Sequence, residues 1–153
     1  MTEARPYVAV VGPGDATREQ IEAAEWIGRG LAQRSAVLVC GGLGGVMAAA
    51  CRGAASAGGL TVGILPGLDR ADANAWVQVA IATGLGELRN GLVVRAADVV
   101  IAIGGAYGTL SEVALALKSG VPVLGLDTWA IDGVERVELA EDALDRALEL
   151  TAR

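Results

Sequence analysis

The fold is decided by residues 36–47, which read Ala-Val-Leu-Val-Cys-Gly-Gly-Leu-Gly-Gly-Val-Met. The first five residues are apolar and rich in valine, a pattern typical of a strand that is buried on both faces. Glycines follow, and a segment rich in small residues over positions 46–57 then predicts a helix that ends at Gly58 and Gly59. A strand, a glycine-rich turn and a helix in succession indicate an α/β fold.

The same alternation recurs along the chain. Apolar runs predict further strands over residues 7–11, 60–65, 77–82, 98–103, 121–126 and 134–139. Segments rich in Ala and Leu predict helices over residues 17–34, 86–96, 110–119 and 141–150, the first opened by a capping box of Thr17 and Gln20. Strands and helices at this spacing predict a Rossmann-like, doubly wound parallel sheet in three α/β/α layers. We expect a single domain over residues 1–153.

Composition narrows the classes of function. The chain has no histidine, which excludes a Ser-His-Asp triad, a Cys-His dyad and a His-ligated zinc site. The formal net charge of −6 argues against nucleic acid as a partner. An acidic protein that binds an anion must do so locally, through backbone amides and one or two arginines. The two cysteines, Cys40 and Cys51, are expected to be buried small hydrophobic residues.

No membrane segment is expected from the sequence. The longest run without charged residues covers positions 35–51, contains several glycines, and is shorter than the roughly 20 apolar residues that a spanning helix needs. The first residues, Met-Thr-Glu-Ala-Arg-Pro-Tyr, lack the apolar centre of a signal peptide. We therefore expect a soluble, cytoplasmic protein without a membrane partner.

Two glycine-rich loops each join a predicted strand to a predicted helix. Glycine lets the backbone approach a ligand closely, and a helix N-terminus supplies N–H donors and a partial positive charge. Both loops follow strands of a parallel sheet, which is the edge where ligands bind in such folds. We therefore expect a phosphorylated ligand, rather than turns with a structural role alone, at Gly41, Gly42, Gly44, Gly45 and Met47 and at Gly104, Gly105, Ala106, Tyr107, Gly108 and Thr109.

Two familiar phosphate motifs do not describe these loops. Neither loop is followed by the Gly-Lys-Ser/Thr of a Walker A motif. A dinucleotide fingerprint should follow the first strand and be trailed by an acidic residue at the end of the second, but here the second strand ends in Cys40 and Gly41. Ordinary NAD binding is therefore disfavoured.

Two charged residues near the loops each allow two interpretations. Thr109 and Glu112 match a helix capping box, so Glu112 is either a cap or a carboxylate that faces the ligand from the first turns of a helix. Arg89 is either a bidentate phosphate clamp or a solvated surface residue. The residues alone leave both questions open.

Taken together, the motifs Gly41-Gly42-x-Gly44-Gly45-Val46-Met47 and Gly104-Gly105-x-x-Gly108-Thr109-x-x-Glu112, with Arg89 between them, resemble the LOG superfamily, once called lysine decarboxylase-like. The resemblance implies a Rossmann-like fold, a phosphate held by the second loop, and a homodimer or higher homo-oligomer. The superfamily includes cytokinin riboside 5′-monophosphate phosphoribohydrolases, and in these enzymes the resemblance implies that the positions corresponding to Arg89 and Glu112 form the catalytic pair. The superfamily also includes molybdenum cofactor carrier proteins.

The chain departs from the hydrolase motif in a way that favours the carrier branch. Gly104 stands where the hydrolases have Pro, Ala106 where they have a second Gly, and Asn90 where Lys usually follows the arginine. The resemblance therefore implies a carrier-like protein that binds molybdopterin or a nucleoside monophosphate. The alternative is a phosphoribohydrolase that cleaves an N-glycosidic bond. Neither requires a cofactor for chemistry; the molybdenum cofactor or an AMP-like molecule is the expected ligand, and no metal ligands are predicted.

Other apolar and aromatic residues leave their roles open. The helix over residues 86–96 places Leu88, Leu92, Val93 and Ala96 either in the core or against a partner subunit, and we expect both. Trp76, Tyr107 and Trp129 are candidates to stack on a ring, and equally for packing or the surface.

Overall fold

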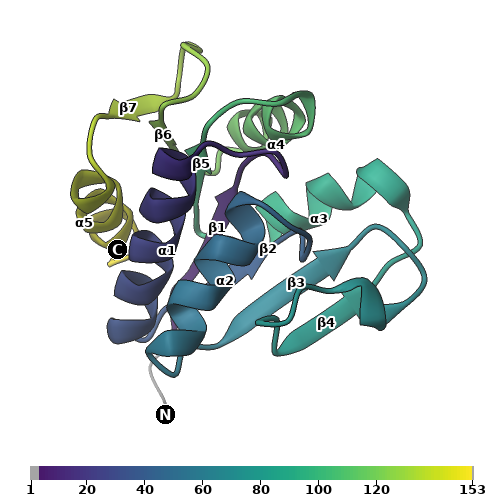
Figure 1. Ribbon diagram of the computed structural model, residues 1–153. Coiled ribbons are helices and arrows are strands. Elements are labelled where there is room, and N and C mark those ends of the chain that lie inside the picture. Colours follow the sequence, from purple (N-terminus) through teal and green to yellow (C-terminus); the bar gives the residue numbers. More distant parts are fainter. Residues whose placement is uncertain (1–3, 153) are drawn as a thin grey trace.

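Seven parallel strands form one sheet in the computed structural model, which describes residues 4–152 (Figure 1). The strand order is β4-β3-β2-β1-β5-β6-β7. The bounds are β1 (Tyr7–Val11), β2 (Val37–Cys40), β3 (Thr61–Leu65), β4 (Val79–Ala82), β5 (Val99–Ile103), β6 (Val123–Leu126) and β7 (Glu135–Val137). The predicted fold class, a doubly wound α/β sheet in a single domain, is confirmed.

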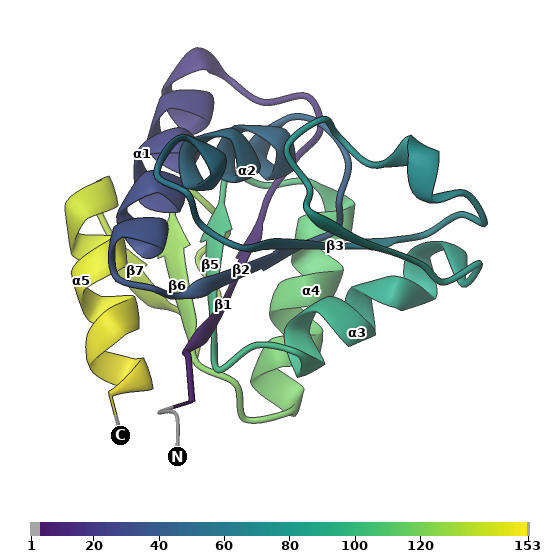
Figure 2. The same ribbon diagram turned by 90° about the horizontal axis from the view of Figure 1, so that it is seen from below.

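Helices cover both faces of the sheet (Figure 2). One face carries α1 (Arg18–Gln33), α2 (Val46–Ser56) and α5 (Ala140–Thr151), and the other carries α3 (Asn90–Arg95) and α4 (Tyr107–Lys118). Two short 3₁₀ turns, η1 (Arg70–Asp72) and η2 (Gly86–Arg89), lie in the connections around β4.

The alternation of side chains along β1 builds a core on each face. Val8 and Val10 pack with α1, α2 and α5, whereas Ala9 and Val11 pack with α3 and α4. Two helical glycines let α1 and α2 approach closely, because a Cβ on Gly28 would lie 2.0 Å from the carbonyl oxygen of Ala50 and one on Gly53 would lie 1.9 Å from that of Glu25. A methyl group at either position would separate the two helices.

The strand order places a switch point between β1 and β5. The chain moves outward in one direction from β1 to β4 and in the other from β5 to β7. The helix after β1 therefore covers one face and the helix after β5 covers the other. Ligands of open α/β sheets bind at such a point, beyond the carboxyl ends of the strands.

Most helix boundaries match the prediction, and the capping box of Thr17 and Gln20 is present at α1. Two predictions are corrected. The segment 86–96 is helical, but its first turn is the 3₁₀ turn η2. The helix predicted over residues 110–119 begins at Tyr107, with Ala106 as its N-cap and no side-chain cap. Thr109 therefore lies inside the first turn, and a capping box of Thr109 and Glu112 is wrong.

Within residues 4–152, no helix combines the length and the apolar character that crossing a membrane requires.

Candidate functional site

The first glycine-rich loop is held by the protein's own groups. Asn74, from the connection between β3 and β4, donates from its backbone N–H to the carbonyl of Gly42 (2.9 Å) and from Nδ2 to the carbonyl of Leu43 (2.9 Å). Gly45 has φ +64°, and a Cβ there would lie 2.3 Å from the carbonyl oxygen of Pro13. The loop after β1 thus packs directly against this turn, which fixes the start of α2.

The same contacts set the direction of two amides in this loop. A trans peptide is planar, so its N–H points opposite to the preceding C=O. Because the carbonyls of Gly42 and Leu43 point to Asn74, the N–H groups of Leu43 and Gly44 point away from it. Both N–H groups are therefore free of Asn74 and are of the kind that donates hydrogen bonds to a bound anion.

The second glycine-rich loop is more open. Gly104 has φ +70° and lies against the side chain of Gln20, which also donates to Asp127 (3.1 Å). No heavy atom lies within 4 Å of the position that a Cβ on Gly108 would take. The first N–H groups of an α-helix have no intrahelical partner, and at the N-terminus of α4 no side-chain cap accepts from them either.

Thr109 adds an unusual feature to this helix start. Its side chain is 2% exposed, and its Oγ1 has no hydrogen-bond partner. A buried hydroxyl without a partner is costly, and native structures contain few of them. A polar ligand group at the second loop would supply the missing partner.

Arg89 is buried rather than solvated. Its Nε donates to the carbonyl of Ile64 (2.9 Å), one terminal nitrogen donates to the carbonyl of Gly41 (3.4 Å), and the other donates to Oδ1 of Asn90. The surface interpretation is therefore wrong. A guanidinium has five N–H groups, and these contacts leave one on each terminal nitrogen. The arginine ties the ends of β2 and β3 together beneath the first loop.

A chain of hydrogen bonds links Arg89 to the second loop. Asn90 receives the contact from Arg89 and donates from Nδ2 to Oγ of Ser111 (2.9 Å). Ser111 donates in turn to the carbonyl of Gly108 (2.7 Å). Neither Ser111 nor Asn74 is predicted from the sequence, because Asn74 donates to carbonyls 31 and 32 positions away and Ser111 accepts from Asn90, 21 positions away, and no local motif marks such contacts.

Glu112 is a buried carboxyl in the second turn of α4. It is 7% exposed, and burial raises the pKa of its carboxyl from the usual 4.5 to about 7, although the positive charge of Arg89 lowers it. The structure thus brings Glu112 close enough to Arg89 for their charges to interact. A carboxyl with this pKa is both a proton donor and an acceptor near neutral pH.

The two cysteines lie behind the first loop. Both are buried thiols, with their sulfur atoms 3.5 Å apart, and Sγ of Cys40 accepts a hydrogen bond from the N–H of Gly42 (3.3 Å). The contact with Cys51 and burial raise the pKa of Cys40 well above its ordinary value. Among the residues that the structure describes, no group of three or more His, Cys, Asp or Glu side chains is placed to hold a metal ion.

The three aromatic candidates lie in different surroundings. Trp129 packs against the second loop, since its Nε1 is 3.1 Å from the position of a Cβ on Gly105. Trp76 lies under the guanidinium of Arg52, 5.4 Å from the ring centre, and Tyr107 is 85% exposed. Met47 lies beside Gly41, at the base of the first loop. The fold thus brings Trp129 to the second loop, which already contains Tyr107.

Solved structures of known proteins resemble this chain closely. The molybdenum cofactor binding protein from Rippkaea orientalis superposes with a TM-score of 0.92 at 36% identity, over 97% of this chain and 99% of that one. The molybdenum cofactor carrier protein from Chlamydomonas reinhardtii superposes with a TM-score of 0.90 at 32% identity, over 98% and 100%. These neighbours agree with the carrier branch that the motifs favoured.

A protein of Archaeoglobus fulgidus named only as uncharacterized is 38% identical over 147 residues, which is 95% of this chain and 97% of that protein. The match to a protein-family model extends over nearly the same length. The resemblance to the LOG superfamily is confirmed by this match. Because residues 5–151 match the model of the SLOG cluster4 family, the chain belongs to that family.

Proposed function

We propose that this chain is a carrier-like protein that binds a phosphorylated, nucleotide-like heterocycle, with the molybdenum cofactor as the first candidate and a nucleoside monophosphate such as AMP as the second. The observation that carries the proposal is the start of α4. There an uncapped helix N-terminus follows Gly104 and Gly105, and the buried Oγ1 of Thr109 has no partner. Such a site suits an oxyanion, which accepts hydrogen bonds from N–H and O–H groups.

In this proposal the phosphate lies on the second loop, from Gly104 to Thr109. The first loop, from Gly41 to Met47, contributes the outward amides of Leu43 and Gly44. The net charge of −6 does not oppose anion binding at this point, because the attraction comes from local amides and the buried Arg89. The two solved relatives named for the molybdenum cofactor support this ligand class.

The test is calorimetric binding of the molybdenum cofactor and of AMP to the purified chain, with the AMP samples analysed by chromatography. We expect binding without release of adenine. Absence of binding by both ligands would contradict the proposal. Release of adenine and ribose 5-phosphate from AMP would instead support the second function, hydrolysis of the N-glycosidic bond.

One observation favours a second function, hydrolysis of the N-glycosidic bond of a nucleoside 5′-monophosphate. Glu112 is a buried carboxyl with a pKa of about 7 that interacts with Arg89. Such a carboxylate would orient a ribose hydroxyl or the attacking water and stabilise positive charge on the sugar. In this case Glu112→Gln abolishes release of adenine and leaves AMP binding intact. If Glu112→Gln releases adenine as fast as the wild type, this role of Glu112 is wrong.

We also propose that the protein is a homodimer or a larger homo-oligomer. Leu88 is 78% exposed, and it lines a hollow between α3 and α4 together with Leu85, Leu92 and Leu115, with Arg95 and Lys118 at the same hollow. Val93 of the same helix lies in the core instead. A second copy that covered this face would bury apolar side chains next to the turn that carries Arg89. Light scattering at micromolar concentration tests the oligomeric state, and a monomer would contradict this proposal.

The cytoplasmic location stays a prediction.

A further inference from the structure

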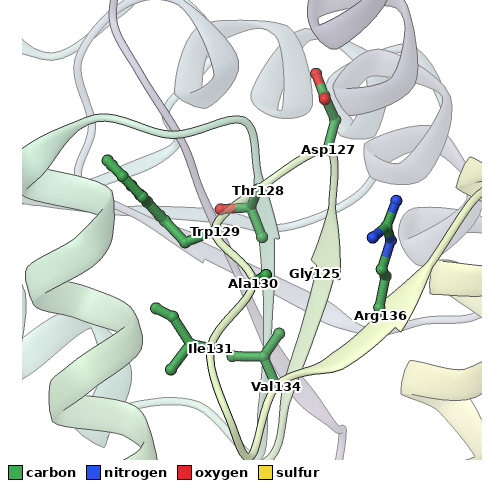
Figure 3. A pocket seen from close by; sticks show the side chains of 8 residues that line it. All are labelled: Gly125, Asp127, Thr128, Trp129, Ala130, Ile131, Val134 and Arg136. Carbon is green, nitrogen blue, oxygen red and sulfur yellow. The ribbon is translucent and has the colours of Figure 1, made fainter.

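A hollow of about 380 Å³ opens beside the second glycine-rich loop. It is formed by the connection from β6 to β7 together with β6 and β7 themselves (Figure 3). The residues that line it are Gly125, Asp127, Thr128, Trp129, Ala130, Ile131, Val134 and Arg136. Small-molecule sites usually begin at roughly 300 Å³, so the hollow is large enough for a fused ring system.

Gly125 and two apolar residues of the β6–β7 connection, Ile131 and Val134, shape the inner wall of this hollow. A Cβ on Gly125 would lie 2.7 Å from Cγ2 of Thr128 and 2.8 Å from Cγ1 of Val134, so a larger residue there would displace both. Ile131 and Val134 pack onto the apolar core beneath α4, which holds the connection in place. The wall is therefore part of the folded core.

The hollow adjoins the second loop through Trp129. The indole lies against Gly105, and in Figure 3 the segment that enters α4 passes beside Trp129. Asp127 points away from Trp129 in this view, toward α1, where it accepts a hydrogen bond from Gln20. The side of the connection that faces the second loop thus presents an indole rather than a carboxylate.

Two buried side-chain oxygen atoms lack a hydrogen-bond partner among residues 4–152, one at the end of the second loop and one in the wall of the hollow. One is Oγ1 of Thr109, in the first turn of α4, and the other is Oγ1 of Thr128, in the wall of the hollow. Figure 3 shows the Thr128 hydroxyl pointing toward the side of the connection on which Trp129 lies. Both hydroxyls are costly without a partner, and the one in the wall of the hollow, Thr128 Oγ1, suits a polar ligand group there.

We propose that this hollow is the ring subsite of the binding site: it takes the fused nitrogen heterocycle of a ligand whose phosphate lies on the second loop, with Trp129 as its stacking surface and the Thr128 hydroxyl as its hydrogen-bond partner. The assignment rests on the proposed function, because it assumes that the second loop binds phosphate. A nitrogen heterocycle fits both groups, since its face stacks on an indole and its edge exchanges hydrogen bonds with a hydroxyl.

The test compares Trp129→Ala with Trp26→Ala. Both tryptophans are 40% exposed, but Trp26 lies on α1, away from the hollow, and so provides a matched control. Binding of 6-hydroxymethylpterin phosphate and of ring-free glycerol 3-phosphate is measured by calorimetry. Trp129→Ala is expected to weaken the pterin phosphate roughly tenfold and to leave glycerol 3-phosphate unchanged, while Trp26→Ala changes neither.

Thr128→Val gives a second, independent readout. Because the hydroxyl has no partner in the protein without ligand, its removal is expected to raise Tm while it weakens binding of the pterin phosphate several-fold. A lower Tm would mean that the hydroxyl is already in use.

The outcomes separate the two proposals. If the wild type binds neither the two probes nor the molybdenum cofactor and AMP, the proposed function fails and the ring subsite fails with it; if it binds the cofactor or AMP but not the pterin phosphate, only the ring subsite is overturned. If the wild type binds both probes and Trp129→Ala binds the pterin phosphate as tightly as the wild type does, only the ring subsite is overturned. An equal loss for both probes in Trp129→Ala also overturns it, since Trp129 then supports the phosphate loop alone.

Discussion

The loops after β2 and β5 both place glycines between a strand and a helix, but their surroundings differ. In the first loop Gly45 meets the carbonyl of Pro13, and Asn74 holds two carbonyls. In the second loop Gly108 borders open space, and Thr109 keeps an unpaired hydroxyl. Gly45 thus serves close packing in the first loop, whereas Gly108 leaves space at the second, so glycines at one edge of a sheet differ in their tolerance to substitution.

The largest expected effect is a loss of stability in Gly45→Ala. A β-carbon there combines a positive φ with an overlap of main-chain atoms, so we expect a loss of about 4 kcal/mol in the free energy of unfolding. Gly44→Ala is the control in the same loop, because nothing lies within 4 Å of its Cβ position. Urea unfolding of both variants measures the difference. Equal losses would mean that the first loop is not packed as described.

Glu112, the buried carboxyl of α4, gives the next effect. Its folded pKa of about 7 exceeds the usual 4.5, so the folded state binds the proton more tightly and stability falls as pH rises through this range. The cost is complete above about pH 7 and amounts to roughly 3 kcal/mol. Glu112→Gln removes it. The stability of the wild type minus that of Glu112→Gln should therefore decrease from pH 4.5 to 7.5, and a flat difference would contradict the burial of this carboxyl.

Arg89→Met tests the support beneath the first loop. It leaves the carbonyls of Ile64 and Gly41 without their donor, and we expect a loss of about 2 kcal/mol in unfolding free energy. It should also raise the pKa of Glu112 further, because the charge of Arg89 lowers it. Arg95→Met, at an exposed position of α3, is the control. Calorimetric unfolding and NMR titration of the Glu112 carboxyl give the two readouts.

The smallest effect on stability is expected at the second loop. Gly105→Ala places a methyl 3.1 Å from the Trp129 indole, a side chain that shifts easily, so we expect a change below about 1 kcal/mol. Binding of AMP, measured by calorimetry, should weaken several-fold because the methyl group narrows the approach to the loop. The opposite result, a clear loss of stability with unchanged affinity, would make the glycine a structural turn residue.

The sequence predicted the fold well because its signals were local. Apolar runs of four to six residues marked strands such as β2 and β5, and the Thr17 capping box marked the start of α1. The error at α4 has a local cause too. Gly108 lies inside the helix, and a glycine there was interpreted as part of a loop. The pattern from Thr109 to Glu112 then gave a false helix start.

The site was harder to predict, since its contacts join distant segments. The positions of Arg89 and Glu112 follow from the family resemblance, but the hydrogen bonds from Arg89 to Ile64 and Gly41 depend on how β2 and β3 pair. The contact of Trp129 with Gly105 arises because β5 and β6 are neighbours in the sheet. No spacing in the sequence encodes either contact.

The two described ends of the chain lie close together, at the edge of the sheet opposite the glycine-rich loops (Figure 2). Pro6 and Thr151 line one shared hollow there, with their neighbours in the chain. A fusion partner, an affinity tag or a solid support attached at either end therefore leaves the loop edge accessible. A circular permutant that joins these ends by a short linker, with its new ends placed away from that edge, should keep the same sheet and the same ligand face.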